Sequence, residues 1–379
     1  MKKLGVYIHI PFCIKKCHYC DFQSFSNLEH IISEYVDALC MEIKSSKEKF
    51  KRYKIKSIFI GGGTPSILTI KDIDKILSVL YSTFEMDSFL EFSIESNPGT
   101  LTKEKVKYYT KSGINRLSIG LQAWQDQLLK KLGRIHDKDT FVKNFHLARE
   151  YGFNNINIDL MFSLPNQTFS HWEETLSNIV DLNPEHISSY SLKIEENTIF
   201  EKEYKSGRLN LPNEEEDRKM YEYTQGFLEK NGYHRYEISN FSKSNYECEH
   251  NKIYWKNEEY IGFGLGAHSY INRIRFSNTN DIKEYIYNIK QDKSSNIIEE
   301  KNSLKDEIAE TMFLGLRMMA GIDLKYFEER YKKSPFEIYE KQILKLQSQG
   351  LLKVDDKNIQ LTNKGIDLSN QVFVEFLLD

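Results

Sequence analysis

The fold of this chain is most constrained by six short apolar segments that alternate with amphipathic segments over the first two-thirds of the sequence. The strand-like segments are Leu4–Ile10, Ile55–Ile60, Phe89–Glu95, Asn115–Leu121, Asn154–Met161 and His186–Leu192. The helix-like segments lie near 31–50, 71–84, 102–112, 138–152 and 170–182. Near-continuous apolar strands separated by helices are typical of a parallel sheet covered by helices. The sequence therefore predicts an α/β fold built on a partial (β/α)6 TIM-like barrel.

Glycine and polar residues follow the predicted strands at the points where the strands end. They are the cysteine-rich loop after residue 10, the run 61–63, Glu95, Gln122 and Asp159. In barrel enzymes the carboxyl ends of the strands carry the chemistry. We therefore expect a functional site at this end of the barrel.

Three cysteines stand in the first of these loops, as C-I-K-K-C-H-Y-C from Cys13 through Cys17 to Cys20. Three thiols in one loop can point at a common centre. A [4Fe–4S] cluster usually takes four cysteines, so three thiolates leave one iron open for an exchangeable ligand. A structural zinc ion prefers four protein ligands, and His9 or His18 would have to complete such a site.

The other two cysteines, Cys40 and Cys248, lie far from the loop in sequence. Because three thiols cannot pair among themselves, a disulfide framework is disfavoured, and the thiols indicate a reducing compartment. The formal net charge of −3 gives no electrostatic reason to bind nucleic acid. The short apolar stretch near the N-terminus is interrupted by His9 and Pro11 and is interpreted as a strand, not a cleaved leader. We expect a cytoplasmic protein, with a peripheral position at the inner face of the membrane left open.

The chain of 379 residues exceeds the roughly 250 residues of one barrel, so a smaller appendage is expected. A polar stretch at 287–303 indicates a linker. After it, Leu351–Val354 and Ile359–Leu361 flank a turn, as in the hairpin of a winged-helix-like α+β domain. The predicted domains are a barrel at 1–235, an extension with the linker at 236–300, and the winged-helix-like domain at 301–379.

The glycine run before Thr64 and Pro65 follows a strand and precedes a helix. Glycines let backbone N–H groups approach a ligand closely, so the run could form a phosphate nest, although a tight turn is equally compatible with it. A dinucleotide fingerprint is absent. Farther along the chain, the guanidinium of Arg134 can hold a carboxylate, and Asp159 can accept hydrogen bonds from ribose hydroxyls.

The C-x3-C-x2-C spacing in the first loop after the first strand resembles the radical S-adenosylmethionine (SAM) superfamily. That resemblance implies that the open iron chelates the amino and carboxylate groups of SAM. It also implies that an electron from the cluster can cleave SAM to a 5′-deoxyadenosyl radical.

Further motifs narrow the resemblance to the oxygen-independent coproporphyrinogen III oxidase branch of this superfamily. They are Y-I-H-I-P-F-C at 7–13, G-G-G-T-P at 61–65, S-I-E at 93–95, G-L-Q at 120–122, G-R-I-H at 133–136 and D-L-M at 159–161. The resemblance implies that Cys13, Cys17 and Cys20 ligate the cluster. It implies SAM contacts at Tyr7, Gly62, Gly63, Thr64, Glu95, Gln122, Arg134 and Asp159. Tyr19 could wall the cluster beside Tyr7, with simple packing as the rival interpretation for both tyrosines.

Two features separate the chain from the oxidase itself. Phe22 stands where the oxidase has a fourth cysteine, and the cysteine loop begins at residue 13 without the oxidase's N-terminal extension. Conversely, H-N-x-x-Y-W at 250–255 resembles the signature of the HemW-type heme chaperones. His250 would then be an axial heme ligand, with Cys248 as an alternative. A structural histidine in an aromatic turn is the competing interpretation.

The resemblance implies a chaperone that binds a [4Fe–4S] cluster, SAM and heme and passes heme to acceptor hemoproteins. Membrane respiratory proteins are candidate acceptors. A bacterioferritin is a candidate heme donor, and dimer formation stays open. Two alternatives remain: SAM-dependent oxidative decarboxylation of coproporphyrinogen III to protoporphyrinogen IX, and another radical-SAM reaction on an unidentified substrate.

Overall fold

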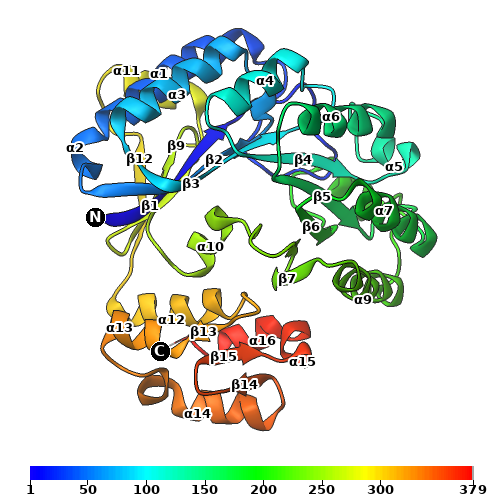
Figure 1. Ribbon diagram of the computed structural model, residues 1–379, viewed down its shortest axis with the longest axis vertical. Helices are drawn as coiled ribbons and strands as arrows, with labels where there is room; N and C mark the ends of the chain where they lie inside the picture. Colours follow the sequence, from blue (N-terminus) through cyan, green and yellow to red (C-terminus); the bar gives the residue numbers. More distant parts are fainter. Residues whose placement is uncertain (378–379) are drawn as a thin grey trace.

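The computed structural model describes residues 1–377, and a parallel six-stranded sheet forms its core (Figure 1). The strands are β1 (Lys2–Ile10), β2 (Tyr53–Gly62), β3 (Glu85–Ser96), β4 (Arg116–Gln122), β5 (Ile156–Phe162) and β6 (His186–Ser191). Each strand pairs in parallel with the next along the chain. The predicted (β/α)6 partial barrel is confirmed, and each predicted strand overlaps an observed one.

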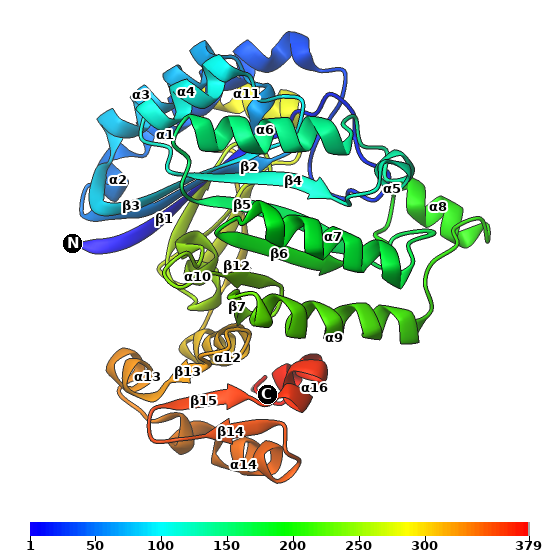
Figure 2. The ribbon, with the colours of Figure 1, turned by 45° about the vertical axis from the view of Figure 1, so that its right-hand side comes forward.

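Helices cover the outer face of this sheet, as Figure 2 shows from a second side. The predicted helices correspond to α1 (Ile32–Ser45) with the short α2 (Lys47–Phe50), α3 (Ile70–Thr83), α4 (Lys103–Lys111), α6 (Lys138–Glu150) and α7 (Phe169–Leu182). Their starts are set by local chemistry; Thr69, for example, forms a capping box with Asp72 at the start of α3. Two short helices were not predicted, α5 (Asp126–Lys131) and α8 (Ile199–Lys205), because one or two turns give too short a periodic pattern.

Additional strands extend the sheet at both edges. At one edge, β9 (Tyr260–Phe263) pairs in parallel with β1, and β10 (His268–Ile271), β11 (Ile274–Asn278) and β12 (Asn296–Lys301) follow antiparallel. At the other edge, β8 (Asn240–Ser242) and β7 (His234–Glu237) follow β6 antiparallel. The linker predicted at 287–303 is therefore wrong: this stretch contains β12, an edge strand whose six residues are all exposed.

Three further helices accompany these edge strands: α9 (Glu214–Lys230), α10 (Glu249–Trp255) and α11 (Ile282–Lys290). Helix α10 lies between the barrel and the C-terminal residues (Figure 1). Glu91 of β3 accepts hydrogen bonds from the backbone N–H groups of Glu249 and His250, at 2.9 and 3.0 Å. A carboxylate at a helix N-terminus accepts hydrogen bonds from the unpaired N–H groups and is attracted by the positive end of the helix dipole. Glu91 therefore fixes where α10 begins.

The C-terminal residues form a small α+β unit with its own apolar core. It contains α12 (Leu304–Gly315), β13 (Ile322–Asp323), α13 (Leu324–Tyr331), α14 (Pro335–Ser348), β14 (Leu352–Val354), β15 (Asn358–Leu361), α15 (Asn363–Asp367) and α16 (Ser369–Val374). The predicted hairpin is confirmed as β14 and β15, which β13 extends to three strands.

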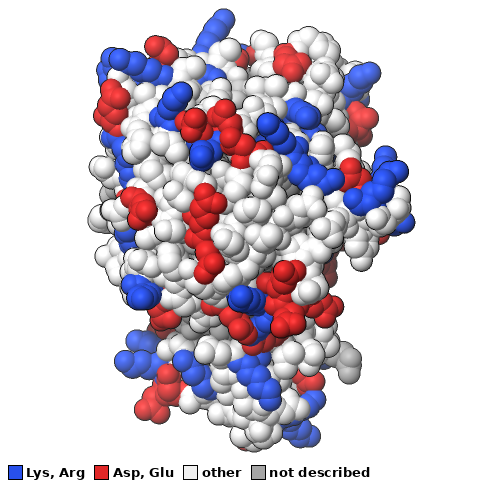
Figure 3. Space-filling view, turned by 90° about the vertical axis from the view of Figure 1, so that its right-hand side faces the viewer, with Lys and Arg blue, Asp and Glu red and all other residues white. Residues whose placement is uncertain are grey.

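Charges of both signs are interspersed over the face drawn in Figure 3, and acidic side chains gather at the waist between the barrel and the C-terminal unit. Nucleic-acid-binding proteins typically present a basic patch or stripe. This face presents none. Among residues 1–377, no helix combines the length and the apolar character needed to cross a bilayer.

Candidate cofactor site at the carboxyl ends of the barrel strands

The cysteine loop leaves β1 at its carboxyl end and folds back on itself. The backbone N–H of Cys13 donates to the carbonyl of Phe25 at 2.8 Å, so the end of the loop returns to its beginning. Cys20 N–H donates to the carbonyl of Cys17 at 3.3 Å. Cys13 is buried, whereas Cys17 and Cys20 are half-buried and all three thiols are free. The loop therefore presents three unpaired thiols at the end of the barrel.

The two unpredicted helices hold the loop from outside. His18 donates from its backbone N–H to the carbonyl of Leu132 at 3.0 Å and from Nδ1 to the carbonyl of Lys131 at 2.9 Å, both at the end of α5. The backbone N–H of Phe200 in α8 donates to the carbonyl of His18 at 3.0 Å. His18 thus holds the middle of the loop against α5 and α8.

The glycine run after β2 packs directly against the cysteine loop. The N–H of Gly63 donates to the carbonyl of Ile10, and the N–H of Thr64 donates to the carbonyl of Phe12, both at 2.8 Å. A Cβ atom on Gly63 would lie 2.7 Å from the Phe12 carbonyl oxygen and 3.0 Å from Cys13 Sγ. The N–H groups of Gly63 and Thr64 are already used, and a side chain at Gly63 would collide with the cysteine loop. The glycine run therefore lets the two loops pack closely and does not form a phosphate nest.

Polar side chains surround the thiols. Thr64 Oγ1 donates to Cys13 Sγ and Arg134 Nη1 donates to Cys17 Sγ, each at 3.5 Å. Burial, together with the neighbouring Cys17 and Cys13 thiols, raises the pKa of the Cys20 thiol to about 11. Since thiolates are the form that binds iron, ligation here depends on the positive charge of the metal together with these hydrogen-bond donors.

Arg134 is fixed by a residue that the sequence analysis missed. Its Nη2 donates to Asn97 Oδ1 at 2.5 Å and to the carbonyl of Gly120 at 2.6 Å. Asn97 in turn donates from Nδ2 to Thr64 Oγ1 at 2.8 Å. Asn97 thereby links the ends of β2, β3 and β4. Its position in an Asn-Pro-Gly turn directly after β3 was the available signal.

Two half-buried carboxylates, those of Glu95 and Asp159, face the same cavity. Burial, together with the charge of Asp159, raises the pKa of Glu95 to about 8, although Gly62 N–H donates to Glu95 Oε2 at 3.0 Å. Burial also raises the pKa of Asp159, which accepts hydrogen bonds from Ser118 and Asn157. A cationic ligand in the cavity would favour the ionised form of both groups.

The structure brings most of the predicted residues together around one cavity. The lining includes Cys13, Cys17, Cys20, Tyr19, Gly62, Gly63, Thr64, Glu95, Gln122, Arg134 and Asp159. Among the residues predicted to contact the cluster or SAM, Tyr7 is the exception. Its hydroxyl hydrogen-bonds His9 Nδ1 at 2.9 Å, while His9 Nε2 donates to the carbonyl of Gln23 at 2.7 Å. Tyr7 therefore reaches the cysteine loop through His9 and does not line the cavity.

The zinc alternative receives no support from this geometry. Within residues 1–377, no three His, Cys, Asp or Glu side chains are grouped closely enough to hold one metal ion. Of the two candidates for a fourth ligand, His9 has both ring nitrogens in hydrogen bonds, and His18 uses Nδ1 in one. Three thiols spread around a cavity fit a multi-iron cluster better than a single ion.

His250 lies away from this cavity, inside the barrel and buried. Its Nδ1 is 2.8 Å from Ser57 Oγ, and its Nε2 is 2.8 Å from Tyr254 Oη. Burial lowers the pKa of His250 to about 3, so the ring is neutral. Axial ligation by His250 would require the loss of one of these hydrogen bonds. Cys248 is also buried, with its thiol pKa raised to about 12 and its Sγ 3.5 Å from Glu91 Oε1.

Comparisons with known proteins agree with this architecture. The profile described as the Radical SAM superfamily matches residues 7–179, and that of the HemN C-terminal domain matches residues 302–368. The chain is 41% identical over 374 residues to the heme chaperone HemW of Bacillus subtilis (strain 168), covering 98% of this chain and 99% of that protein. It is 39% identical to the heme chaperone HemW of Lactococcus lactis subsp. lactis, covering 100% of this chain and 98% of that protein.

Among solved structures, the chain is similar to coproporphyrinogen III oxidase (HemN) from Escherichia coli, which is described as a radical SAM enzyme. The TM-score is 0.87 at 25% sequence identity, and the match covers 99% of this chain and 90% of that one. The barrel, the three-cysteine loop and the near-complete alignments with HemW proteins lead to one assignment. The chain belongs to the radical SAM superfamily and, within it, to the HemW family.

Proposed function

We propose that this protein is a heme chaperone that binds a [4Fe–4S] cluster and SAM and delivers heme to acceptor hemoproteins. The observation that carries the proposal is the alignment of nearly the whole chain with HemW heme chaperones at 41% and 39% identity. The cavity supports the cofactor part, because three thiols and two half-buried carboxylates lie around it.

The roles of the site residues follow from their chemistry. Cys13, Cys17 and Cys20 would hold the cluster, which supplies one open iron for SAM when bound. Arg134 would position the SAM carboxylate through its guanidinium group. Glu95 would accept from the SAM amino group, and Asp159 from the ribose hydroxyls. Gln122, with φ of 76°, borders the same cavity.

The thiolate assignment is tested by Cys17→Ser, with Cys40→Ser as the matched control. Cys40 is a buried free cysteine outside the cavity. The variant at Cys17 should lose the visible absorption of the cluster and most of its iron after anaerobic reconstitution, whereas the Cys40 variant should keep both. A normal iron content in Cys17→Ser would overturn the ligand assignment.

The chaperone function is tested by an anaerobic titration of the cluster-loaded protein with hemin, followed by the Soret band. Saturable binding near one equivalent, and transfer to a heme-free acceptor protein, are expected. Absence of specific heme binding, together with CO2 release from coproporphyrinogen III in the presence of SAM and a reductant, would favour the oxidase alternative instead. Measurement of 5′-deoxyadenosine in the same reactions decides whether SAM is cleaved or only bound.

For the biological setting we propose a cytoplasmic protein that meets its acceptors at the inner face of the membrane, with respiratory hemoproteins as the acceptor class. A bacterioferritin-like protein is the proposed heme donor. Dimer formation is a further proposal, which light scattering of the cluster-free and cluster-loaded forms would test. No role in nucleic-acid binding is expected at a net charge of −3.

A further inference from the structure

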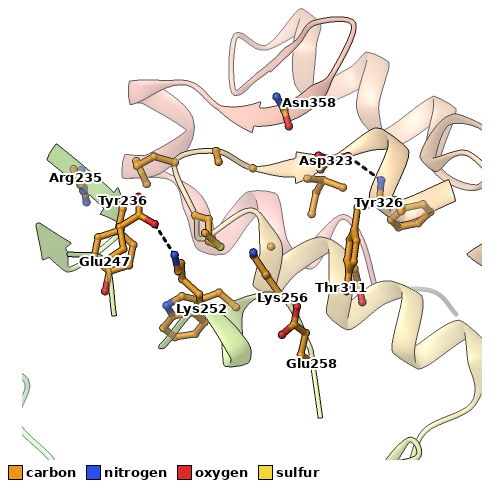
Figure 4. A pocket seen from close by; sticks show the side chains of 18 of the residues that line it. Arg235, Tyr236, Glu247, Lys252, Lys256, Glu258, Thr311, Asp323, Tyr326 and Asn358 are labelled. Atoms are coloured by element: carbon orange, nitrogen blue, oxygen red, sulfur yellow. Dashed lines mark hydrogen bonds and ion pairs between the residues drawn. The ribbon is translucent and has the colours of Figure 1, made fainter. Parts of the chain in front are cut away.

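A second and larger cavity lies between the barrel and the C-terminal unit (Figure 4). Its volume is 520 Å³, within the range of about 300–1,000 Å³ that is typical of small-molecule sites. One wall comes from β7 and α10, and the other from α12, the segment 318–323 and α13. This cavity shares no lining residue with the cavity at the cysteine loop.

Helix α10 divides the H-N-x-x-Y-W motif between two environments. His250 and Tyr254 face the barrel interior, where they hydrogen-bond each other. Lys252 and Trp255 line the interdomain cavity, as does Lys256 at the end of the helix. In Figure 4, Lys252 and Lys256 project from α10 toward the C-terminal wall. The motif therefore contributes to a cavity that its histidine does not line.

The cavity combines an apolar wall with charged groups of both signs, since Arg235, Lys252 and Lys256 line it together with Glu247, Glu258 and Asp323. The apolar wall includes Met318, Met319, Ile322 and Phe327. Trp255 Nε1 is a buried donor, and it has no hydrogen-bond partner among residues 1–377. Because this N–H is not accessible from the cavity, it is not one of the groups that would receive a ligand there.

The two lysines differ in how far they are neutralised. Lys252 forms ion pairs with Glu247 at 2.7 Å and with Glu249 at 2.5 Å. Lys256 makes no ion pair within the part of the chain that the structure describes. Lys256 is thus the cation best placed to receive an anionic substituent of a ligand.

We propose that this interdomain cavity, and not the barrel interior around His250, is the heme site; this inference rests on the proposed chaperone function. Heme is a flat apolar macrocycle with two carboxylates at one edge. The apolar wall suits the macrocycle, and Lys256 suits a carboxylate. Thioether and imidazole groups, the usual neutral ligands of heme iron, are also present on the wall in Met318, Met319 and His234.

A cargo in this position would be held by both parts of the molecule. Movement of the C-terminal unit would open the cavity without disturbing the cysteine loop, because the two cavities have no residue in common. Heme binding is therefore expected to be independent of SAM at the cluster.

The test is a hemin titration of the cluster-loaded full chain carrying Ala320→Trp. Ala320 lies on the cavity wall and is exposed, so an indole there can fill the opening without replacing core packing. Lys353→Trp is the matched control, since Lys353 is exposed on β14 of the same unit and does not line the cavity. Lys256→Glu is an independent second variant that reverses the charge at the edge.

Ala320→Trp and Lys256→Glu should each weaken hemin binding at least tenfold, while wild type and Lys353→Trp bind about one equivalent. Iron content and thermal unfolding midpoints close to wild type would show that the variants are folded. Unchanged affinity in both variants would overturn the interdomain site but leave the chaperone function standing. Absence of binding in the wild type would instead contradict the proposed function itself, and with it this inference.

Discussion

At the scale of single residues, the cofactor cavity is held together by a few half-buried polar contacts. Arg134 reaches Cys17, Asn97 and the Gly120 carbonyl at once, so one guanidinium joins the cysteine loop to the ends of β3 and β4. Lysine cannot reproduce this arrangement, because its ammonium group is compact and lacks the planar fork. The geometry of the cavity therefore depends on an arginine at this position.

Arg134→Lys should weaken SAM binding to the cluster-loaded protein by about tenfold or more, equivalent to at least about 1.4 kcal/mol. Equilibrium binding of SAM measures this change. Arg149→Lys is the control, since Arg149 forms a similar two-pronged contact with Glu185 outside the cavity. Equal SAM affinities in wild type and Arg134→Lys would show that Arg134 does not hold the ligand.

At the scale of elements, a buried carboxylate joins α1 to the segments around β9 and α11. Glu42 accepts hydrogen bonds from Gly264 N–H at 2.9 Å, Asn278 Nδ2 at 2.7 Å and the Tyr285 hydroxyl at 2.7 Å. Burial nevertheless raises the pKa of Glu42 from 4.5 to about 7. The folded protein therefore binds this proton more tightly than the unfolded chain does.

This pKa shift predicts a pH dependence of stability. The contribution of Glu42 to the free energy of unfolding is fully present below about pH 4.5, falls as the pH rises, and levels off above about pH 7. Glu42→Gln should remove this fall in the free energy of unfolding, which amounts to at most about 1.4 kcal/mol per pH unit.

Urea unfolding of wild type and Glu42→Gln at several values between pH 5 and 8 measures the difference. The variant should become more stable relative to wild type as the pH rises, even if the amide itself costs some stability. Glu48→Gln, at an exposed position of α2, should run parallel to wild type. Parallel curves for Glu42→Gln would contradict the raised pKa.

At the scale of the whole molecule, hydrogen bonds from Arg330 attach the C-terminal unit to the barrel. Arg330 of α13 donates to the carbonyls of Lys256 and Asn257 at 3.0 and 2.8 Å, and its Nη2 is 2.7 Å from Glu307 Oε1. Because the two backbone acceptors follow α10, these bonds connect the C-terminal unit to the helix that lines the interdomain cavity. We propose that residues 301–379 act as a separate domain hinged at this contact.

Arg330→Ala should loosen this attachment by about 1.5–3 kcal/mol, the usual range for hydrogen bonds that involve a charged group. Faster amide hydrogen exchange is expected in α10, α12 and α13, with little change in β1–β6. The control is Lys325→Ala, whose side chain on the same helix is 87% exposed. Uniformly faster exchange throughout the barrel would indicate general destabilisation and contradict a hinge at this contact.

The sequence by itself determined the six strands, their order and the clustering of chemistry at their carboxyl ends. Strand periodicity and the spacing of Cys13, Cys17 and Cys20 are local properties of the sequence. Parallel strands bring their carboxyl ends to one edge of the sheet regardless of how the loops between them fold. The tertiary structure decided the rest. The strand at 296–301 exists because β11 offers it an edge, and the contact of Asn97 with Arg134 joins residues 37 positions apart. The division of the H-N-x-x-Y-W motif between the barrel interior and the interdomain cavity likewise depends on what packs against each face of α10, which no local pattern encodes.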